Sequence, residues 1–202
     1  MASPPPGILI LAAGLGRRYT RAGGVGNKLM SCHTGSDARP RPIFDICLHH
    51  AQASGLPLHI VLRPEAVALQ AIARRYGASF SMLASEGMGH SIARGVRDTP
   101  AWSGWLIQPA DMTHIRPGDY QRLAAALTRH SQARLYWQGA PGHPVAFSAR
   151  WRDSLTALSG DVGAKSLLTP AELLVLEAHP GVLIDHDLPP SSAHSCAAQY
   201  RP

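Results

Sequence analysis

The chain has 202 residues and a formal net charge of +6; 45% of its residues are hydrophobic and 16% are charged. This length supports one sizeable core, and the composition excludes a disordered chain. No apolar run approaches the roughly 20 residues that span a bilayer, so we expect no membrane-spanning helix and no membrane among the partners. We predict a single domain over residues 1–202, with flexible ends at 1–6 and about 190–202.

The patterns of charge and cysteine limit the kinds of binding partner and the cellular location that we expect. Arginines are scattered and aromatic residues are only 6%, which favours a nucleotide over nucleic acid as the anionic partner. The start MASPPPG has no basic region followed by an apolar segment, so a cytoplasmic location is expected. Cys32, Cys47 and Cys196 lack C-x-x-C spacing, and we predict that all three are reduced and structural.

Strands and helices alternate along the chain. An aliphatic strand over 8–11 runs into a loop over 12–28 that is rich in glycine and arginine. Asp119 is predicted to cap a helix that begins at about residue 120. Further helices are predicted over 43–54, 65–76, 91–96 and about 120–127, strands over 58–62, 80–83, 105–108, 135–137, 144–147, 173–176 and 182–184, and a mobile loop over 31–42.

This alternation predicts an α/β fold with a mostly parallel central sheet and helices on both faces. In such folds ligands bind at the carboxyl ends of the strands. Two loops, 12–28 and 109–114, follow strands at that edge. We therefore expect them to meet around one ligand.

The first loop has the composition of a polyphosphate site. Glycines let phosphate approach the main chain, and Arg17, Arg18, Arg21 and Lys28 supply positive charge. The dinucleotide pattern G-x-G-x-x-G and the P-loop pattern both fail here. The alternative is a basic surface loop without a ligand.

Three later motifs carry polar side chains that suit a phosphate site. Asp111 follows an apolar strand, where it is either a Mg²⁺ ligand beside a triphosphate or a turn cap. Residues 158–165, LSGDVGAK, are either an anion site at a helix start or an ordinary capped helix. Residues 184–187, IDHD, are either part of the site or a solvated strand end.

Taken in order, these motifs resemble the molybdenum-cofactor nucleotidylyltransferases, and most closely their molybdopterin cytidylyltransferase branch. The shared motifs are LAAG followed by Arg and then Lys28, GMGHSIARG at 87–95, PADM at 109–112, GHP at 142–144, LSGDVGAK at 158–165 and IDHD-LP at 184–189. The resemblance implies a Rossmann-like nucleotidyltransferase fold. It also implies an enzyme that transfers CMP from CTP to the phosphate of molybdopterin with Mg²⁺ and releases pyrophosphate.

Residue roles follow from the same resemblance. Alanine at position 13, where the guanylyl branch has glycine, implies CTP rather than GTP. The implied catalytic residues are Arg18, Lys28 and Asp111; the nucleotide-binding residues are Leu11, Ala12, Ala13, Gly14, Gly16, Arg18, Lys28, Gly89 and Ser91; the acceptor-binding residues are His143, Asp161 and Lys165; and the metal ligands are Asp111 and Asp187. A recipient molybdoenzyme or its maturation chaperone is a further implied partner.

The sequence departs from the family pattern at four places, and two alternatives stay open. The interval from Arg18 to Lys28 is longer than the family's loop, Tyr19 replaces a methionine, Lys165 replaces an arginine, and the end motif has Leu188-Pro189-Pro190-Ser191 in place of Thr-Pro-Glu-Asp. One alternative is a nucleotidyltransferase for a sugar phosphate or another small phosphorylated acceptor. The other is a non-catalytic protein that binds the cofactor during maturation.

Overall fold

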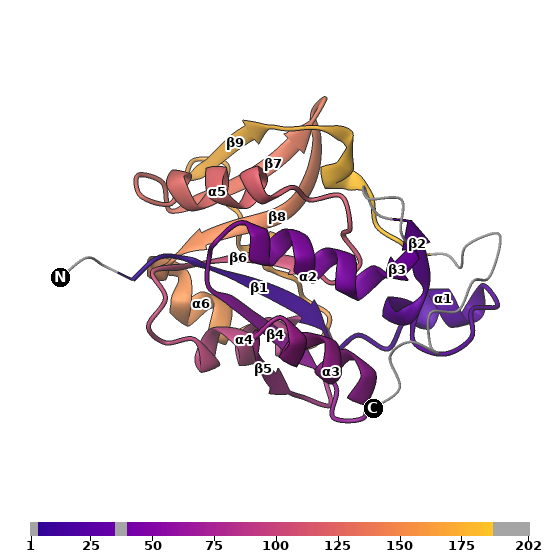
Figure 1. Ribbon diagram of the computed structural model, residues 1–202. Helices are drawn as coiled ribbons and strands as arrows, with labels where there is room; N and C mark the ends of the chain where they lie inside the picture. The colour runs from indigo at the N-terminus through magenta and orange to yellow at the C-terminus, as the bar shows by residue number, and fades with distance from the viewer. Residues whose placement is uncertain (1–3, 35–39, 188–202) are drawn as a thin grey trace.

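A seven-stranded sheet forms the centre of the computed structural model, which describes residues 4–34 and 40–187 (Figure 1). The strand order is β5-β4-β1-β6-β8-β7-β9. The strands β5, β4, β1 and β6 are parallel, β8 is antiparallel to both neighbours, and β9 is parallel to β7. Their bounds are β1 (Gly7–Ala12), β4 (Leu58–Leu62), β5 (Ser79–Met82), β6 (Gly104–Pro109), β7 (Gln132–Trp137), β8 (Ala140–Ser148) and β9 (Leu173–Glu177).

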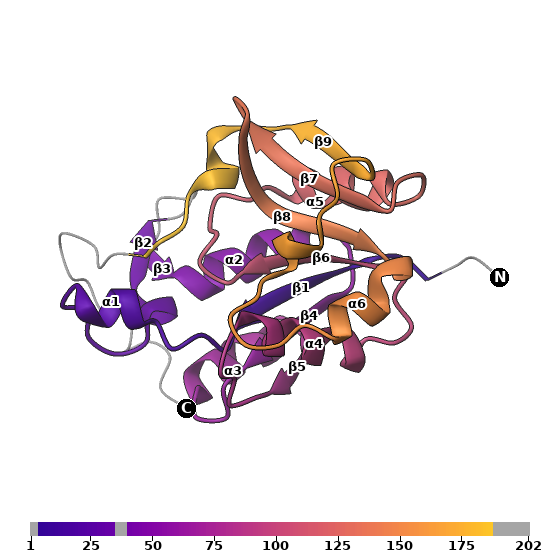
Figure 2. The same cartoon turned by 180° about the vertical axis from the view of Figure 1, so that it is seen from behind.

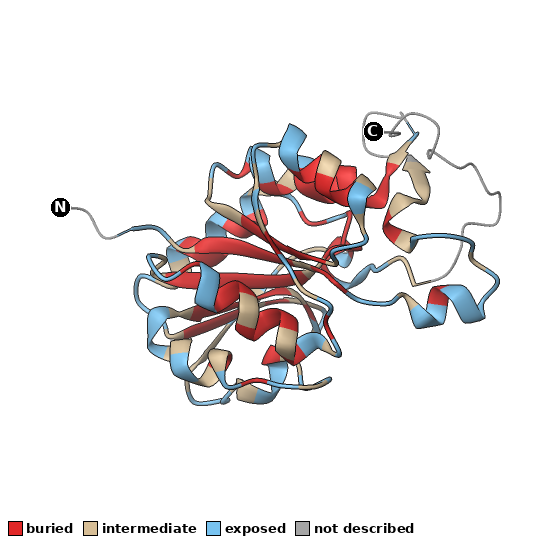
Figure 3. Cartoon of the chain, turned by 90° about the horizontal axis from the view of Figure 1, so that it is seen from below, coloured by how far each residue is buried: buried red, intermediate tan, exposed pale blue. Residues whose placement is uncertain are grey.

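Helices cover both faces of this sheet, which confirms the predicted α/β fold (Figures 1 and 2). One face packs against α2 (Ile43–Ala53), α3 (Val67–Arg75) and α5 (Pro117–Ala126), and the other against α4 (Met88–Asp98) and α6 (Arg152–Thr156). Ile8 and Ile10 belong to the first apolar cluster and Leu9 to the second. Burial on both faces explains why β1 is a continuous aliphatic run (Figure 3).

Shorter elements lie beyond the end of the sheet to which β1 points (Figure 1). They are α1 (Arg17–Arg21), the 3₁₀ helix η1 (Lys28–Met30) and the antiparallel pair β2 (Cys32–Thr34) and β3 (Pro40–Pro42). Three more 3₁₀ helices are η2 (Ala149–Trp151), η3 (Ala164–Leu167) and η4 (Pro180–Leu183). Among the described residues, no helix has the length and apolar character needed to cross a membrane.

Strand register brings the predicted ligand loops together. Ala12 is paired with Leu62, Leu11 with Pro109, and Leu62 with Met82. The four parallel strands therefore end at the same edge, and the segments that follow them start side by side. This arrangement matches the prediction that loops 12–28 and 109–114 meet.

Two element predictions are wrong. Residues 182–184 were expected to form a strand, but residues 180–183 form η4: Pro180 is its first residue, His179 caps it by accepting the N–H of Gly181 at 3.2 Å, and Val182 is buried in the core. The expected loop over 31–42 contains β2 and β3, whose polar, proline-containing sequence gives no strand pattern, and its centre lies outside the described residues.

Local chemistry corrects two further predictions. Asp119 does not cap α5 from outside: it lies in the first turn, where its carboxylate accepts the backbone N–H of Arg116 at 2.8 Å. Cys32 is disulfide-bonded rather than reduced. An odd number of cysteines does not exclude one disulfide pair. Cys47 is free and fully buried, as predicted, and burial raises its pKa to about 12. Cys196 lies outside the described residues.

Candidate active site

A cleft of about 700 Å³ opens where the parallel strands end. It is lined by residues after β1, β4, β5 and β6 and by part of the segment 158–187. The residues assigned from sequence that line it are Leu11, Ala12, Ala13, Gly14, Gly16, Arg18, Lys28, Ser91, Asp111, Asp161 and Asp187. Segments far apart in the sequence thus converge on one space.

The long first loop is anchored by Tyr19. This side chain is only 6% exposed, and its hydroxyl lies 2.8 Å from Ser31 Oγ. A Cβ atom on Gly24 would lie 2.2 Å from the Tyr19 ring, so only glycine allows the chain to cross the ring this closely. Residues 21–25 therefore extend away from the cleft lining, and the chain returns to the cleft at residues 26–28.

Lys28 lies between two carboxylates in the cleft. Its Nζ donates to Asp111 Oδ2 at 2.5 Å and to Asp187 Oδ1 at 3.0 Å. Arg18 Nη1 donates to the other oxygen of Asp187 at 2.8 Å. The side chains of Lys28 and Asp111 are 14% and 10% exposed, whereas Arg18 is 82% exposed and its ion pair is screened by solvent.

The electrostatics of this cluster follow from its neighbours. Burial alone would lower the pKa of Lys28, but Asp111 and Asp187 outweigh burial and raise it. Burial would raise the pKa of Asp187, but hydrogen bonds from Lys28 and Arg18 hold it below its usual range. Burial and the charges of Asp187 and Asp111 raise the pKa of Asp185. Three carboxylates thus share two cationic side chains, and the cluster favours additional positive charge.

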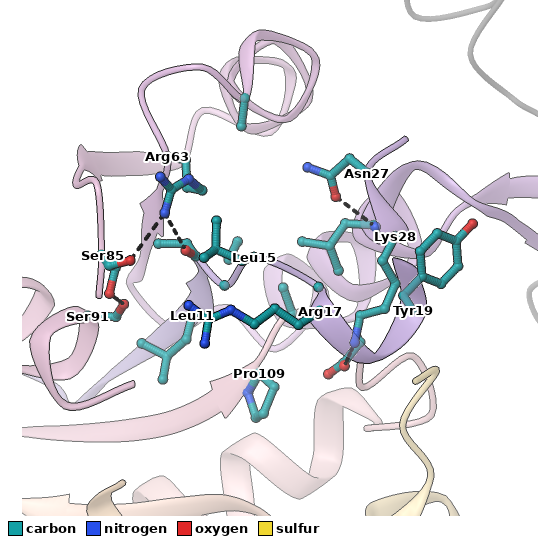
Figure 4. A pocket seen from close by; sticks show the side chains of 18 of the residues that line it. Leu11, Leu15, Arg17, Tyr19, Asn27, Lys28, Arg63, Ser85, Ser91 and Pro109 are labelled. Atoms are coloured by element: carbon teal, nitrogen blue, oxygen red, sulfur yellow. Dashed lines mark hydrogen bonds and ion pairs between the residues drawn. The ribbon is translucent and has the colours of Figure 1, made fainter. Parts of the chain in front are cut away.

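Arg63 lies across the cleft from Lys28 (Figure 4). Its Nη1 donates to Ser85 O at 3.2 Å and to Ala13 O at 3.5 Å, and its Nε pairs with Glu65. Ser91 Oγ in turn donates to Ser85 Oγ at 2.8 Å. Arg63 therefore ties the loop after β1 to the loop after β5. The sequence analysis missed this residue, although it directly follows β4 at the ligand-binding edge.

One wall of the cleft is a contact between two glycine-containing segments. Gly89 N donates to Gly160 O at 2.8 Å. A Cβ atom would lie 2.2 Å from Gly160 O at Gly87 and 2.6 Å from Ser159 O at Gly89. Gly89 is consequently buried against backbone and does not line the cleft. This contact places Asp161 at the cleft and joins the motifs at 87–95 and 158–165.

Two residues assigned to the acceptor lie apart from the cleft lining. His143 is half-buried on β8, and its pKa is lowered to about 4 by burial and by Arg134, with the Asp111 charge opposing. Its Nδ1 is buried without a partner in the described part of the chain. Lys165 is exposed on η3, which has only four residues.

Residues 8–177 match the family described as the MobA-like NTP transferase domain. The chain belongs to this family. Its members transfer nucleotides from nucleoside triphosphates, and the chain is accordingly a nucleotidyltransferase. None of the curated protein sequences matches the chain.

Solved structures share the fold of this MobA-like chain. Rv0371c from Mycobacterium tuberculosis H37Rv is 20% identical, with a TM-score of 0.77 over 93% of this chain and 95% of that chain. A structure of Rv0371c in complex with manganese has 19% identity and a TM-score of 0.68 over 92% and 91%. The 4-diphosphocytidyl-2C-methyl-D-erythritol synthase of Anaerococcus prevotii DSM 20548 has 12% identity and a TM-score of 0.66 over 90% of both chains.

Proposed function

We propose that this MobA-like protein transfers CMP from CTP to the terminal phosphate of molybdopterin and releases pyrophosphate. The observation that carries the proposal is the Lys28, Asp111 and Asp187 cluster at the mouth of the nucleotide loop. Together with Arg18 it provides two cationic side chains for a triphosphate, and it provides two carboxylates for the metal. The order of sequence motifs supports molybdopterin as the acceptor.

In this reaction an acceptor phosphate oxygen attacks the α-phosphorus of CTP. A new P–O bond forms, the bond between the α-phosphorus and its bridging oxygen breaks, and pyrophosphate leaves with the electron pair. The acceptor phosphate is already anionic near neutral pH, so the protein needs no general base. The protein acts by positioning and by charge: Lys28 and Arg18 neutralise phosphate oxygens, and the backbone around Gly14 admits the triphosphate.

Asp111 and Asp187 are the proposed ligands of Mg²⁺. Asp111 Oδ1 is buried and has no partner in the described part of the chain, which fits an oxygen that awaits a cation. No cluster of three His, Cys, Asp or Glu residues that could hold a metal occurs within 4–34 and 40–187. This fits Mg²⁺, which typically takes one or two carboxylates together with substrate phosphates and water. When bound, the ion would stabilise charge on the phosphate oxygens. The manganese complex of Rv0371c supports a divalent ion in this fold.

Ala13 is the proposed source of the preference for CTP. Ala13 lines the cleft but is only 1% exposed and belongs to the second apolar cluster, and its backbone carbonyl accepts from Arg63, so its methyl group packs behind the cleft wall and fixes the position of that wall. A larger purine needs more room than a pyrimidine. One methyl group in a tight pocket changes discrimination by about tenfold or more.

Asp161, His143 and Lys165 are proposed to meet the acceptor. Asp161 lies on the cleft, whereas His143 and Lys165 reach it only if the acceptor extends beyond the cleft lining. The second candidate acceptor is a small phosphorylated alcohol. It is favoured by the fold shared with the diphosphocytidyl-methylerythritol synthase.

A labelling experiment tests the proposal. With CTP labelled on the α-phosphate, we expect the label in a product that contains both CMP and molybdopterin, and none in the released pyrophosphate. Label transfer to a sugar phosphate but not to molybdopterin would favour the second candidate. In the same assay Ala13→Gly should lower the CTP:GTP preference by about tenfold. An unchanged ratio would refute the role of Ala13.

A further inference from the structure

Lys28 occupies the space between the two carboxylates proposed to bind the metal. Its ammonium contacts Asp111 Oδ2 at 2.5 Å and Asp187 Oδ1 at 3.0 Å. The second oxygen of Asp187 is taken by Arg18, and the second oxygen of Asp111 is buried without a partner in the described residues. A cationic group of this protein therefore already lies where a metal would bind.

A divalent ion shared by Asp111 and Asp187 would find Asp111 Oδ1 open, but at Asp187 it would compete with cations for both oxygens, which are taken by Lys28 and Arg18. Mg²⁺ binds carboxylate oxygens at about 2.0–2.1 Å and demands regular octahedral geometry. Two cations on one pair of carboxylates repel each other, and the repulsion is stronger where solvent is largely excluded, as it is around Lys28 and Asp111. Metal entry therefore requires that Lys28 leave.

The position of Lys28 allows its side chain to move toward the nucleotide loop. Lys28 begins η1, and its Cβ lies 3.8 Å from the position of a Cβ atom on Gly16, so its stem runs beside the nucleotide loop. The N–H of Leu29 is fixed by the Asn27 side chain at 3.0 Å, which holds the backbone in place. Rotation of the side chain alone can therefore carry the ammonium from the carboxylates to phosphate oxygens.

We propose that Lys28 holds the metal position until a nucleoside triphosphate arrives, so that divalent metal binds with the nucleotide and only weakly before it. The triphosphate offers the ammonium a stronger anionic partner and draws it off Asp111 and Asp187. This inference rests on the proposed function for the assignment of these two carboxylates to the metal. It adds an order of binding that the assignment alone does not contain.

Competition of this kind lowers the apparent affinity for metal. If metal binds only when Lys28 has left, the measured dissociation constant is the intrinsic one divided by the fraction of molecules with the site vacated. A side chain in place about 90% of the time weakens metal binding about tenfold. Removal of the ammonium should abolish this effect.

Manganese binding without nucleotide tests the competition, measured by electron paramagnetic resonance on the full chain. We expect Lys28→Met to bind Mn²⁺ about tenfold or more tightly than the wild type, and Lys28→Arg to remain weak because it keeps a cation. Arg17→Met is the matched control: it removes one positive charge from the same cleft and should change the affinity far less. Equal affinities in wild type and Lys28→Met, with both proteins folded, would overturn the inference.

The position of the metal is tested with a second substitution. Asp111→Asn in the Lys28→Met background should abolish the tight Mn²⁺ binding, because the ion would lose a charged ligand. Retained tight binding would overturn the inference, since the metal would then lie elsewhere. Neither measurement needs an acceptor or turnover, so both can be interpreted even if the protein does not act on molybdopterin.

The movement of Lys28 has its own readout because the chain contains only two lysines, Lys28 and Lys165. In protein with ¹³C-labelled lysine, the NMR signal of Lys28 should shift when CTP is added without metal, and exposed Lys165 serves as the internal control. A Lys28 signal that CTP leaves unchanged at saturating binding would contradict the proposal.

Discussion

Gly89→Ala disturbs the backbone contact that joins the start of α4 to residues 159–161. The added Cβ would lie 2.6 Å from Ser159 O, 2.7 Å from Ser159 N and 2.8 Å from Ser159 C. All three are backbone atoms, so the contact cannot be relieved by turning a side chain. One of the two segments must move, and the hydrogen bond from Gly89 N to Gly160 O weakens.

The expected cost combines three contributions. Overpacking costs about 1–3 kcal/mol, and a weakened hydrogen bond costs about 0.5–1.5 kcal/mol. Alanine in a helix gains about 1 kcal/mol over glycine. The steric cost wins, and we expect a net loss of about 1–3 kcal/mol. In a chain of this size that lowers Tm by about 3–10 °C.

Thermal unfolding followed by circular dichroism measures this effect. Gly118→Ala is the matched control: it makes the same substitution in α5, where no atom lies within 4 Å of the added Cβ. We expect Gly118→Ala to leave Tm unchanged or slightly raised. A Gly89→Ala protein as stable as Gly118→Ala would refute the tight contact between the two segments.

Two further predictions concern the site, and a third concerns His143 on β8. Asp111→Asn should lower turnover more than a hundredfold, because even residues that only hydrogen-bond to metal ligands contribute 10–100-fold. Steady-state rates at saturating metal measure this, and near wild-type turnover would contradict it. Arg63→Met should raise KM for the nucleotide about tenfold with a smaller change in kcat, since Arg63 links the loops after β1 and β5; Arg63→Lys is the control that keeps the charge, and an effect on kcat alone would contradict the linking role. His143 has a folded pKa of about 4 against an ordinary 6.5, so the unfolded state binds more protons between these values and stability falls as pH decreases through this window, by about 3 kcal/mol for this group. Urea unfolding at several pH values should show a smaller acid loss in His143→Asn, and an equal loss would contradict burial of neutral His143.

The central sheet could be predicted because its strands are apolar runs bounded by glycine, proline or charge. The strand over 58–62 was predicted at its observed bounds, and β1 and β6 within two residues at each end. The prediction failed where sequence and environment diverge. Val182 continues an aliphatic run, yet Pro180 and the His179 cap start a 3₁₀ helix, and Val182 enters the core as part of η4.

The candidate site was predictable from motifs but not from the properties of its single residues. Asp111 and Lys28 were assigned through the order of motifs, and the structure brings them into contact across 83 positions of sequence. The sequence could not show that residues 21–25 extend away from the cleft, because that depends on the packing of Tyr19 against Gly24. Arg63 was not predicted as a site residue because a single arginine before proline belongs to no known motif, although its position directly after β4 could have indicated it.

The most direct test of the proposed reaction is pyrophosphate release with CTP, GTP, ATP and UTP in turn, with Mg²⁺ and with or without molybdopterin. We predict release with CTP, and only when molybdopterin is present. Release that prefers another nucleotide, or no release from folded protein that binds CTP and molybdopterin, would contradict a cytidylyltransferase that acts on this acceptor.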